Sequence, residues 1–184
     1  PEAVYENPYG DGPVYAFTGA MDYWPNIDAV QWFADEIFPL VRAARPDARF
    51  AIVGSNPTDQ VKALGRRDGI LVTGRVPDIR PYVAHAEAVV VPLRIARGIQ
   101  NKVLEAMAMG RFIVAAGPAL QGVESEARAH LRVADEAAEF ARHLIETDAA
   151  TRAALGRGAA EYVRRAYGWE ANLAVVDQAL AGLA

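Results

Sequence analysis

Short runs of apolar residues recur along the chain, and each run ends at glycine, proline or polar residues. Within a run the apolar residues are continuous, which is typical of strands buried on both faces of a parallel sheet. We predict six such strands, at residues 14–18, 50–53, 70–73, 88–91, 112–115 and 130–133. The strands alternate with segments of helical period. The pattern therefore predicts an α/β fold with a doubly wound parallel sheet of about six strands.

The two ends of the chain depart from this alternation. Residues 1–13 are rich in Pro, Gly, Asn and Tyr without periodicity, and we interpret them as a tail or interdomain linker. After the sixth strand the pattern is helical, at residues 135–147, 148–167 and 169–180. We therefore expect one domain over residues 14–184, with helices at its carboxyl terminus.

Composition disfavours several kinds of function. The 184 residues carry a net charge of −4, which argues against general nucleic-acid binding. The chain has no cysteine, so it has no disulfide, thiolate nucleophile or zinc–cysteine site. Its three histidines are far apart without ligand spacing, so we expect no metal centre. No apolar run approaches the ~20 residues that span a bilayer.

Small or polar residues follow almost every predicted strand. In doubly wound folds, ligands bind beyond the carboxyl ends of the strands, where glycine lets the backbone approach a ligand closely. One glycine at a strand end is ordinary turn chemistry, but small residues at nearly all ends favour a binding edge. The residues at these ends include Gly19, Gly54, Gly74, Pro92 and Gly117.

Common cofactor and catalytic motifs are absent from this edge. The first strand continues as FTGAMDYWP, with one glycine where a dinucleotide fingerprint needs three. The chain also lacks a P-loop, and neither of its serines, Ser55 and Ser125, lies in a Gly-x-Ser-x-Gly elbow. NAD, FAD and a P-loop type of ATP site are therefore disfavoured.

The remaining chemistry is concentrated between the fourth and fifth strands. Arg94, Arg97, Gly98 and Lys102 lie in a loop and at a predicted helix start, an arrangement that suits a diphosphate. Glu105 follows on the same helix face as Lys102, and an ionised carboxylate can accept hydrogen bonds from the two vicinal hydroxyls of a ribose. The alternative is a Lys102–Glu105 surface salt bridge, which would contribute little.

From Arg97 to Gly110 the chain resembles the nucleotide-sugar motif of glycosyltransferase family 4, or glycosyl transferases group 1, which have the GT-B fold. That motif reads Glu, seven residues, Glu-Ala-Met-Ala, one residue, Gly. LEAMAMGRFIVAA matches its second half, with Glu105 as the second glutamate, whereas Arg97 stands at the first. Gly98, Lys102 and Glu105 fit the Gly-x-x-x-Lys-x-x-Glu-Ala form that some members carry. The stretches PDARFAIVGSNP, ILVTGRVPDIRPYVAHAEAVVVPLR and YGWEANL extend the resemblance over nearly the whole chain from residue 14.

The resemblance implies a donor site in a Rossmann-like domain. Glu105 would bind the ribose hydroxyls, and Lys102, Arg94 and the amides near Gly98 would bind the pyrophosphate. The backbone at residues 74–76 would face the base. The role of Arg97 stays open between a third phosphate ligand, a substitute sugar contact and a loss of transfer chemistry. The implied donor-binding residues are Glu105, Lys102, Arg94, Arg97, Gly98, Gly19, Gly74, Arg75 and Val76.

The same resemblance implies the carboxyl-terminal, donor-binding half of a retaining glycosyltransferase of the hexosyltransferase type, needing neither a cofactor nor a metal. It would transfer sugar from a UDP-sugar or GDP-sugar to a glycan or lipid-linked acceptor in polysaccharide biosynthesis. An amino-terminal acceptor domain would precede Pro1, so we expect this fragment alone to be inactive. We expect a cytoplasmic location, with peripheral contact of the full-length enzyme at the inner face of the membrane as an alternative. Two other hypotheses remain: a nucleotide-sugar epimerase-like enzyme, and a non-catalytic nucleotide-binding module.

Overall fold

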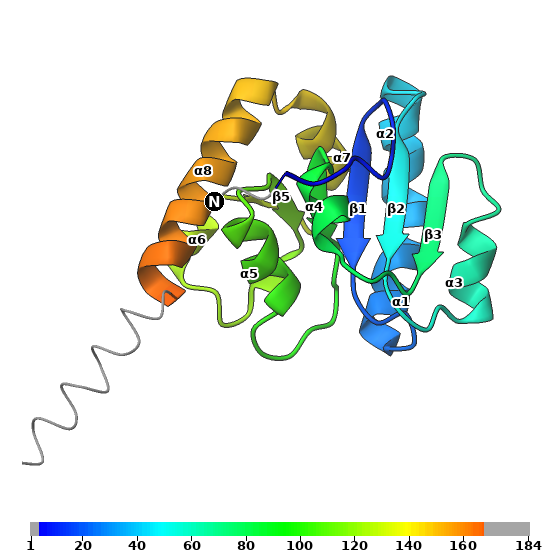
Figure 1. The fold of residues 1–184 in the computed structure, drawn as a ribbon, viewed down its shortest axis with the longest axis horizontal. Coiled ribbons are helices and arrows are strands. Elements are labelled where there is room, and N and C mark those ends of the chain that lie inside the picture. Colours follow the sequence, from blue (N-terminus) through cyan, green and yellow to red (C-terminus); the bar gives the residue numbers. More distant parts are fainter. Residues whose placement is uncertain (1–3, 168–184) are drawn as a thin grey trace, which may run out of the picture.

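The computed structural model describes residues 4–167 of the chain and shows six parallel strands in the order β3-β2-β1-β4-β5-β6 (Figure 1). This confirms the predicted fold class and all six predicted strands, with small changes at their ends. The strands are β1 (Val14–Thr18), β2 (Arg49–Val53), β3 (Ile70–Gly74), β4 (Ala88–Val91), β5 (Ile113–Ala115) and β6 (Arg132–Val133).

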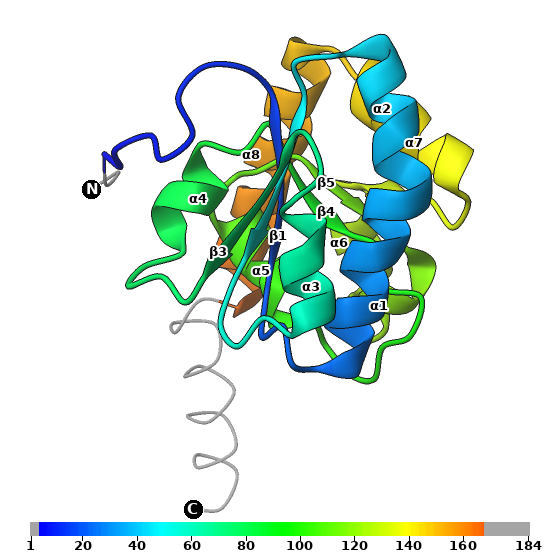
Figure 2. The same cartoon turned by 90° about the vertical axis from the view of Figure 1, so that its right-hand side faces the viewer.

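Helices cover both faces of the sheet (Figure 2). One face carries α1 (Trp24–Trp32), α2 (Phe38–Ala44), α3 (Asp59–Leu64) and α7 (Ala137–Glu146). A π-helical segment, η1 (Phe33–Ile37), joins α1 to α2. The other face carries α4 (Arg80–Ala84), α5 (Asn101–Ala108) and α8 (Ala149–Tyr167). The short helices η2 (Gly117–Leu120) and α6 (Ser125–Arg128) lie between β5 and β6.

Strand β1 shows why the apolar runs are continuous. Its Tyr15 and Phe17 belong to the larger core cluster, together with Phe33 and Phe50, whose ring centroids lie 4.3 Å apart. Its Val14 belongs to a second cluster that includes Ala16, Ala51, Val53 and Tyr9. Because both faces of the strand are buried, no position alternates to a solvent-facing polar residue.

Part of the predicted linker is packed against the domain. Tyr9 is only 8% exposed, its hydroxyl donates to the Tyr82 carbonyl at 3.0 Å, and the two rings pack edge to face. Arg49 donates to the Tyr9 carbonyl at 2.6 Å. Residues 4–13 therefore do not form a free tail, because an aromatic anchor within them covers the α4 side of the sheet. The helix predicted at residues 169–180 lies outside the described residues.

The strand order places a topological switch point between β1 and β4. From β1 the chain proceeds through β2 to the edge strand β3, and it then crosses to the other side of β1 to form β4. The connections that leave β1 and β4 therefore run to opposite faces of the sheet, and they separate at its carboxyl edge. Ligand sites of open α/β sheets lie at such points.

Glycines fix the position of α5 beside this switch point. Gly110 ends α5 with a φ of +65°, a conformation that favours glycine. A Cβ atom on Gly156 of α8 would lie 2.1 Å from the Gly110 carbonyl oxygen. Only glycine therefore lets α8 pack directly on the end of α5. The helix that carries Lys102 and Glu105 is held in place by this contact.

Candidate functional site

A cleft of about 510 Å³ opens at the carboxyl edge of the sheet, at the switch point. It is formed by the loops that follow β1, β2 and β3 together with the start of α5. Both polar and apolar side chains line it, as expected of a site for a small organic molecule. The lining residues are Thr18, Gly19, Tyr23, Asn26, Val53, Gly54, Ser55, Arg75, Val76, Ile79, Ile99, Gln100, Asn101, Lys102 and Glu105.

Two glycines form one wall of the cleft by direct backbone contact. A Cβ atom on Gly54 would lie 1.7 Å from the carbonyl oxygen of Gly19, so the ends of β1 and β2 can meet only if residue 54 has no side chain. The Gly19 amide donates to the Val53 carbonyl at 3.1 Å. The result is a wall of bare backbone, which a ligand can approach closely.

Lys102, in the first turn of α5, places a cation within this cleft. Its Nζ donates to Asn26 Oδ1 at 2.6 Å and lies 4.1 Å from the centre of the Phe17 ring. Burial lowers the pKa of Lys102 to about 7, and the nearby Glu105 carboxylate only partly opposes this. Among the ion pairs of residues 4–167, none joins Lys102 to Glu105. The structure therefore shows Lys102 bonded to Asn26 and no surface salt bridge between Lys102 and Glu105.

The amino terminus of α5 adds further positive potential. Gln100, Asn101 and Lys102 line the cleft around the first turn, where backbone N–H groups have no partner within the helix. The Gln100 side-chain amide donates to the carbonyls of Arg97 and Gly98, which orders the loop before the helix. The aligned peptide dipoles of α5 favour an anion at this end.

Five of the donor-site residues predicted from the sequence are brought together in the cleft. Lys102 and Glu105 come from α5, Gly19 from the end of β1, and Arg75 and Val76 from the loop after β3. Glu105 is exposed and lies about one turn beyond Lys102. The cleft therefore brings together the Lys102 cation, the Glu105 carboxylate and the backbone at Gly19.

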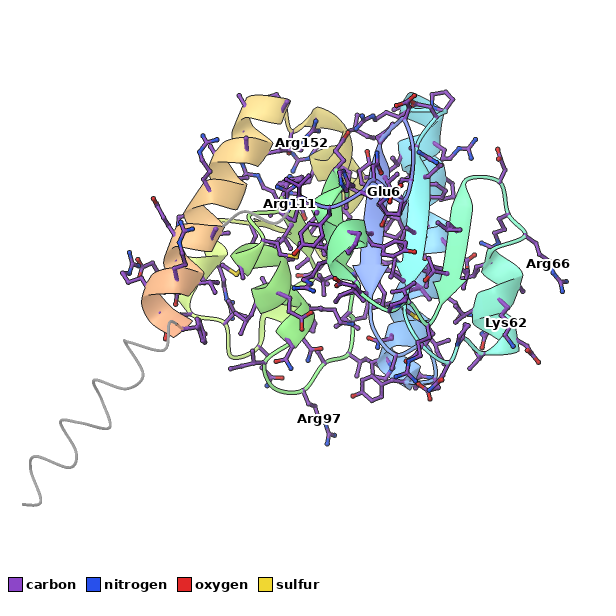
Figure 3. The ribbon with its side chains drawn as sticks, viewed as in Figure 1. Glu6, Lys62, Arg66, Arg97, Arg111 and Arg152 are labelled. Atoms are coloured by element: carbon purple, nitrogen blue, oxygen red, sulfur yellow. The ribbon has the colours of Figure 1, made fainter. Side chains whose placement is uncertain are left out.

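The other four predicted residues do not line the cleft. Arg94 instead forms an ion pair with Asp28 of α1, with its Nε 3.1 Å from Asp28 Oδ2, and its guanidinium lies 5.3 Å from the centre of the Trp32 ring. Arg97 is exposed in the loop before α5 and points away from the ribbon (Figure 3). Gly98, with a φ of +67°, lies at a bend in that loop, and Gly74, with a φ of +69°, ends β3.

The pairing of Asn26 with Lys102 was not predicted. Asn26 lies in the first turn of α1 and is only 5% exposed, and its partner is on a different helix 76 positions away in the sequence. No local spacing signals such a contact. Gln100 and Asn101 were also missed as lining residues, although both precede the predicted helix at the same sheet edge.

Comparison with known proteins shows the family to which the chain belongs. Residues 12–147 match the family model described as Glycosyl transferases group 1. The chain belongs to this family. A search of curated proteins found no match. In residues 4–167 there is no group of three or more potential ligand side chains that could hold a metal ion, and no helix long and apolar enough to cross a membrane.

Solved glycosyltransferase structures share the fold. Sucrose-phosphate synthase from Thermosynechococcus elongatus superposes with a TM-score of 0.66 at 22% identity, over 94% of this chain and 46% of that protein. TarM from S. aureus, in a complex that includes UDP, gives 0.71 at 18% identity over 93% of this chain and 36% of TarM. HepE from Anabaena, with UDP and glucose, gives 0.63 at 18% identity, over 83% and 43%. The chain thus spans less than half of each of these proteins. It has the Rossmann-like fold of one part of a GT-B glycosyltransferase.

Proposed function

We propose that this chain is the donor-binding, carboxyl-terminal domain of a retaining family 4 glycosyltransferase. In this proposal the cleft binds the nucleoside diphosphate of a UDP-sugar or GDP-sugar, and the sugar passes to a glycan or lipid-linked acceptor. The observation that carries the proposal is Lys102. Its ammonium group lies at a helix amino terminus inside the cleft, and it is bonded to a neutral amide and not to a carboxylate.

Each wall of the cleft suits a different part of such a donor. Lys102 and the free amides at the start of α5 would bind the diphosphate, with the bare backbone of Gly19 beside it. Glu105, one turn further along α5, would accept hydrogen bonds from the two ribose hydroxyls. The backbone and side chains of Arg75 and Val76 would contact the base. The proposal leaves Arg94 and Arg97 outside the donor site, since neither lines the cleft.

The comparisons support the nucleotide and leave its base open. TarM and HepE have been solved with UDP, HepE also with UDP-glucose. Because Lys102 and the α5 dipole supply the positive charge, we propose that the donor binds without a resident metal ion. Binding that is unchanged by EDTA would agree with this. The acceptor domain, the cytoplasmic location and any contact with a membrane surface are parts of the same proposal and belong to the intact enzyme.

Calorimetric titration with UDP, GDP and ADP tests the proposal. We expect the 184-residue chain to bind at least one of them, and Glu105→Ala to lose about 1.5–3 kcal/mol of binding free energy, because a charged acceptor of hydrogen bonds is removed. Glu36→Ala, an exposed carboxylate outside the cleft, is the matched control and should bind as the wild type does. If no nucleotide binds to this chain or to a longer protein that contains it, the proposal is wrong.

A further inference from the structure

Asn26 gives Lys102 an unusual environment for a partly buried lysine. The Lys102 ammonium group donates to one neutral side-chain oxygen, at 2.6 Å, and otherwise faces the Phe17 ring. No carboxylate of the described residues lies within ion-pairing distance of it. Withdrawal of a lysine from water without a counter-charge disfavours its charged form and so lowers its pKa.

The orientation of the Asn26 side chain is fixed from the other side. Its Nδ2 donates to the Ala20 carbonyl at 2.9 Å, so its Oδ1 must face Lys102. A Cβ atom on Gly19 would lie 2.7 Å from Asn26 Nδ2 and 3.1 Å from Lys102 Nζ, so residue 19 leaves room for the pair only as glycine. The Lys102–Asn26 contact therefore depends on three segments: the end of β1, which contributes Gly19, and the first turns of α1 and α5.

We propose that Asn26 is a positioning residue that aims Lys102 into the cleft without neutralising it, so that a nucleoside diphosphate binds together with one proton. This inference rests on the proposed function of the cleft. It goes further by stating that Lys102, and with it the donor site, gains its positive charge when the nucleotide binds. Neutral Lys102 takes a proton from water, and the resulting ammonium pairs with the diphosphate. One N–H is enough for the bond to Asn26 in either protonation state.

The charges around Lys102 agree with this linkage. Burial lowers the pKa of Lys102 to about 7, and Glu105 on the same helix raises it only in part. Arg75 also lines the cleft, and Asp22, in the β1–α1 loop, accepts a hydrogen bond from Asn56. A diphosphate within a few ångströms would favour the charged lysine and raise its pKa. Proton uptake should therefore be largest between pH 7 and the higher pKa of the complex.

The test is calorimetry of the tightest-binding nucleotide among UDP, GDP and ADP at pH 8, in two buffers of different ionisation enthalpy. The difference in apparent binding enthalpy gives the number of protons taken up. We expect uptake of about half a proton or more per nucleotide, because a group with a pKa of about 7 is mostly neutral at pH 8. The last phosphate proton, with a pKa of about 6, is already lost at this pH and does not interfere.

Four variants separate the protonation of Lys102 from its positioning by Asn26. Lys102→Arg keeps a permanent charge, so it should bind with uptake below about 0.2 proton. Asn26→Asp supplies a carboxylate that holds Lys102 protonated, and should also show uptake below about 0.2 proton, with at least 10-fold weaker binding. Asn26→Ala should weaken binding about 5-fold and retain the proton uptake. Gln60→Ala, which alters an exposed amide on α3 outside the cleft, should behave as the wild type.

Three results would overturn the inference. Nucleotide binding by the wild type with uptake below about 0.2 proton at pH 8 would refute proton linkage and leave the proposed function intact. Wild-type affinity and proton uptake in both Asn26 variants would refute the positioning role. Absence of binding for every nucleotide would refute the proposed function together with this inference.

Discussion

Arg94 and Lys102 both belong to the segment that runs from the end of β4 into the first turn of α5, yet the fold gives their charges opposite surroundings. Arg94 turns toward α1 and pairs with the Asp28 carboxylate above the Trp32 ring. Lys102 turns into the cleft and meets only the neutral Asn26 amide. The charge of Arg94 is satisfied within the protein, whereas that of Lys102 is available to a ligand. A basic residue in such a segment therefore indicates an anion site only when its own hydrogen-bond partner in the protein leaves its charge unpaired.

The largest effect should come from removing the cleft cation. Lys102→Met keeps a long apolar chain over the Phe17 ring but deletes the charge. Loss of a charge-assisted contact of about 1.5–3 kcal/mol should weaken nucleoside diphosphate binding roughly 10- to 150-fold, as measured by calorimetry. Lys62→Met, which alters an exposed lysine on α3 outside the cleft, is the control. Equal affinity in the two variants would remove Lys102 from the site.

A smaller loss should follow from crowding the lysine without removing it. The Cβ atom introduced by Gly19→Ala would lie 2.7 Å from Asn26 Nδ2 and 3.1 Å from Lys102 Nζ, so the pair must shift. We expect about 10-fold weaker binding and a loss of about 1–3 kcal/mol in unfolding free energy from overpacking. Gly65→Ala, at the end of α3, should retain affinity. Undiminished binding by Gly19→Ala would show that the geometry of the lysine–amide pair is unimportant.

The stability of the folded protein should depend on pH through Lys102. Its pKa is about 7 in the folded chain and near the ordinary lysine value of 10.5 in the unfolded chain, so between these values the unfolded state binds more protons. Lys102 therefore makes the unfolding free energy rise with pH across this window, by at most about 1.4 kcal/mol per pH unit. Below pH 7 the lysine is charged in both states and the full cost of burying it is present.

Urea unfolding of wild type and Lys102→Met from pH 6 to pH 10 isolates this contribution. We expect the variant to gain stability relative to the wild type at pH 6, and the difference to shrink as the pH rises. A difference that stays constant over this range would contradict a shifted lysine pKa.

The smallest effect should come from the other cation. Arg94→Met breaks a partly exposed ion pair, so it should cost no more than about 1 kcal/mol of unfolding free energy. Nucleotide affinity should change less than about 2-fold, because Arg94 does not line the cleft. A 10-fold loss of affinity would return Arg94 to the diphosphate and erase the distinction between the two residues.

The fold could be predicted because its signal is local. Runs such as Val14–Thr18 and Ala88–Val91 are apolar throughout since both faces of the sheet are covered, and the sequence shows this directly. The order of the strands and the switch point required the structure. The packing of Tyr9 was hidden because its partner, Tyr82, is distant in the sequence and the surrounding residues 1–13 have no periodicity.

The site could be predicted only in part for a similar reason. Lys102 and Glu105 share a helix, so their spacing places them on one face. Arg94 belongs to the same stretch, but its direction is decided by Asp28, which is 66 positions away in the sequence. The contact of Asn26 with Lys102 is equally remote in sequence. Long-range pairs of charged and amide groups, and not the local motif, determine which side chains reach the cleft.

A crystal structure of the chain with its tightest-binding nucleoside diphosphate would test the central claim most directly. We expect the diphosphate within hydrogen-bonding distance of Lys102 Nζ and the first amides of α5, the ribose hydroxyls on Glu105, and the Arg94–Asp28 pair unchanged. A diphosphate bound to Arg94 or Arg97, with Lys102 remote from it, would contradict the account.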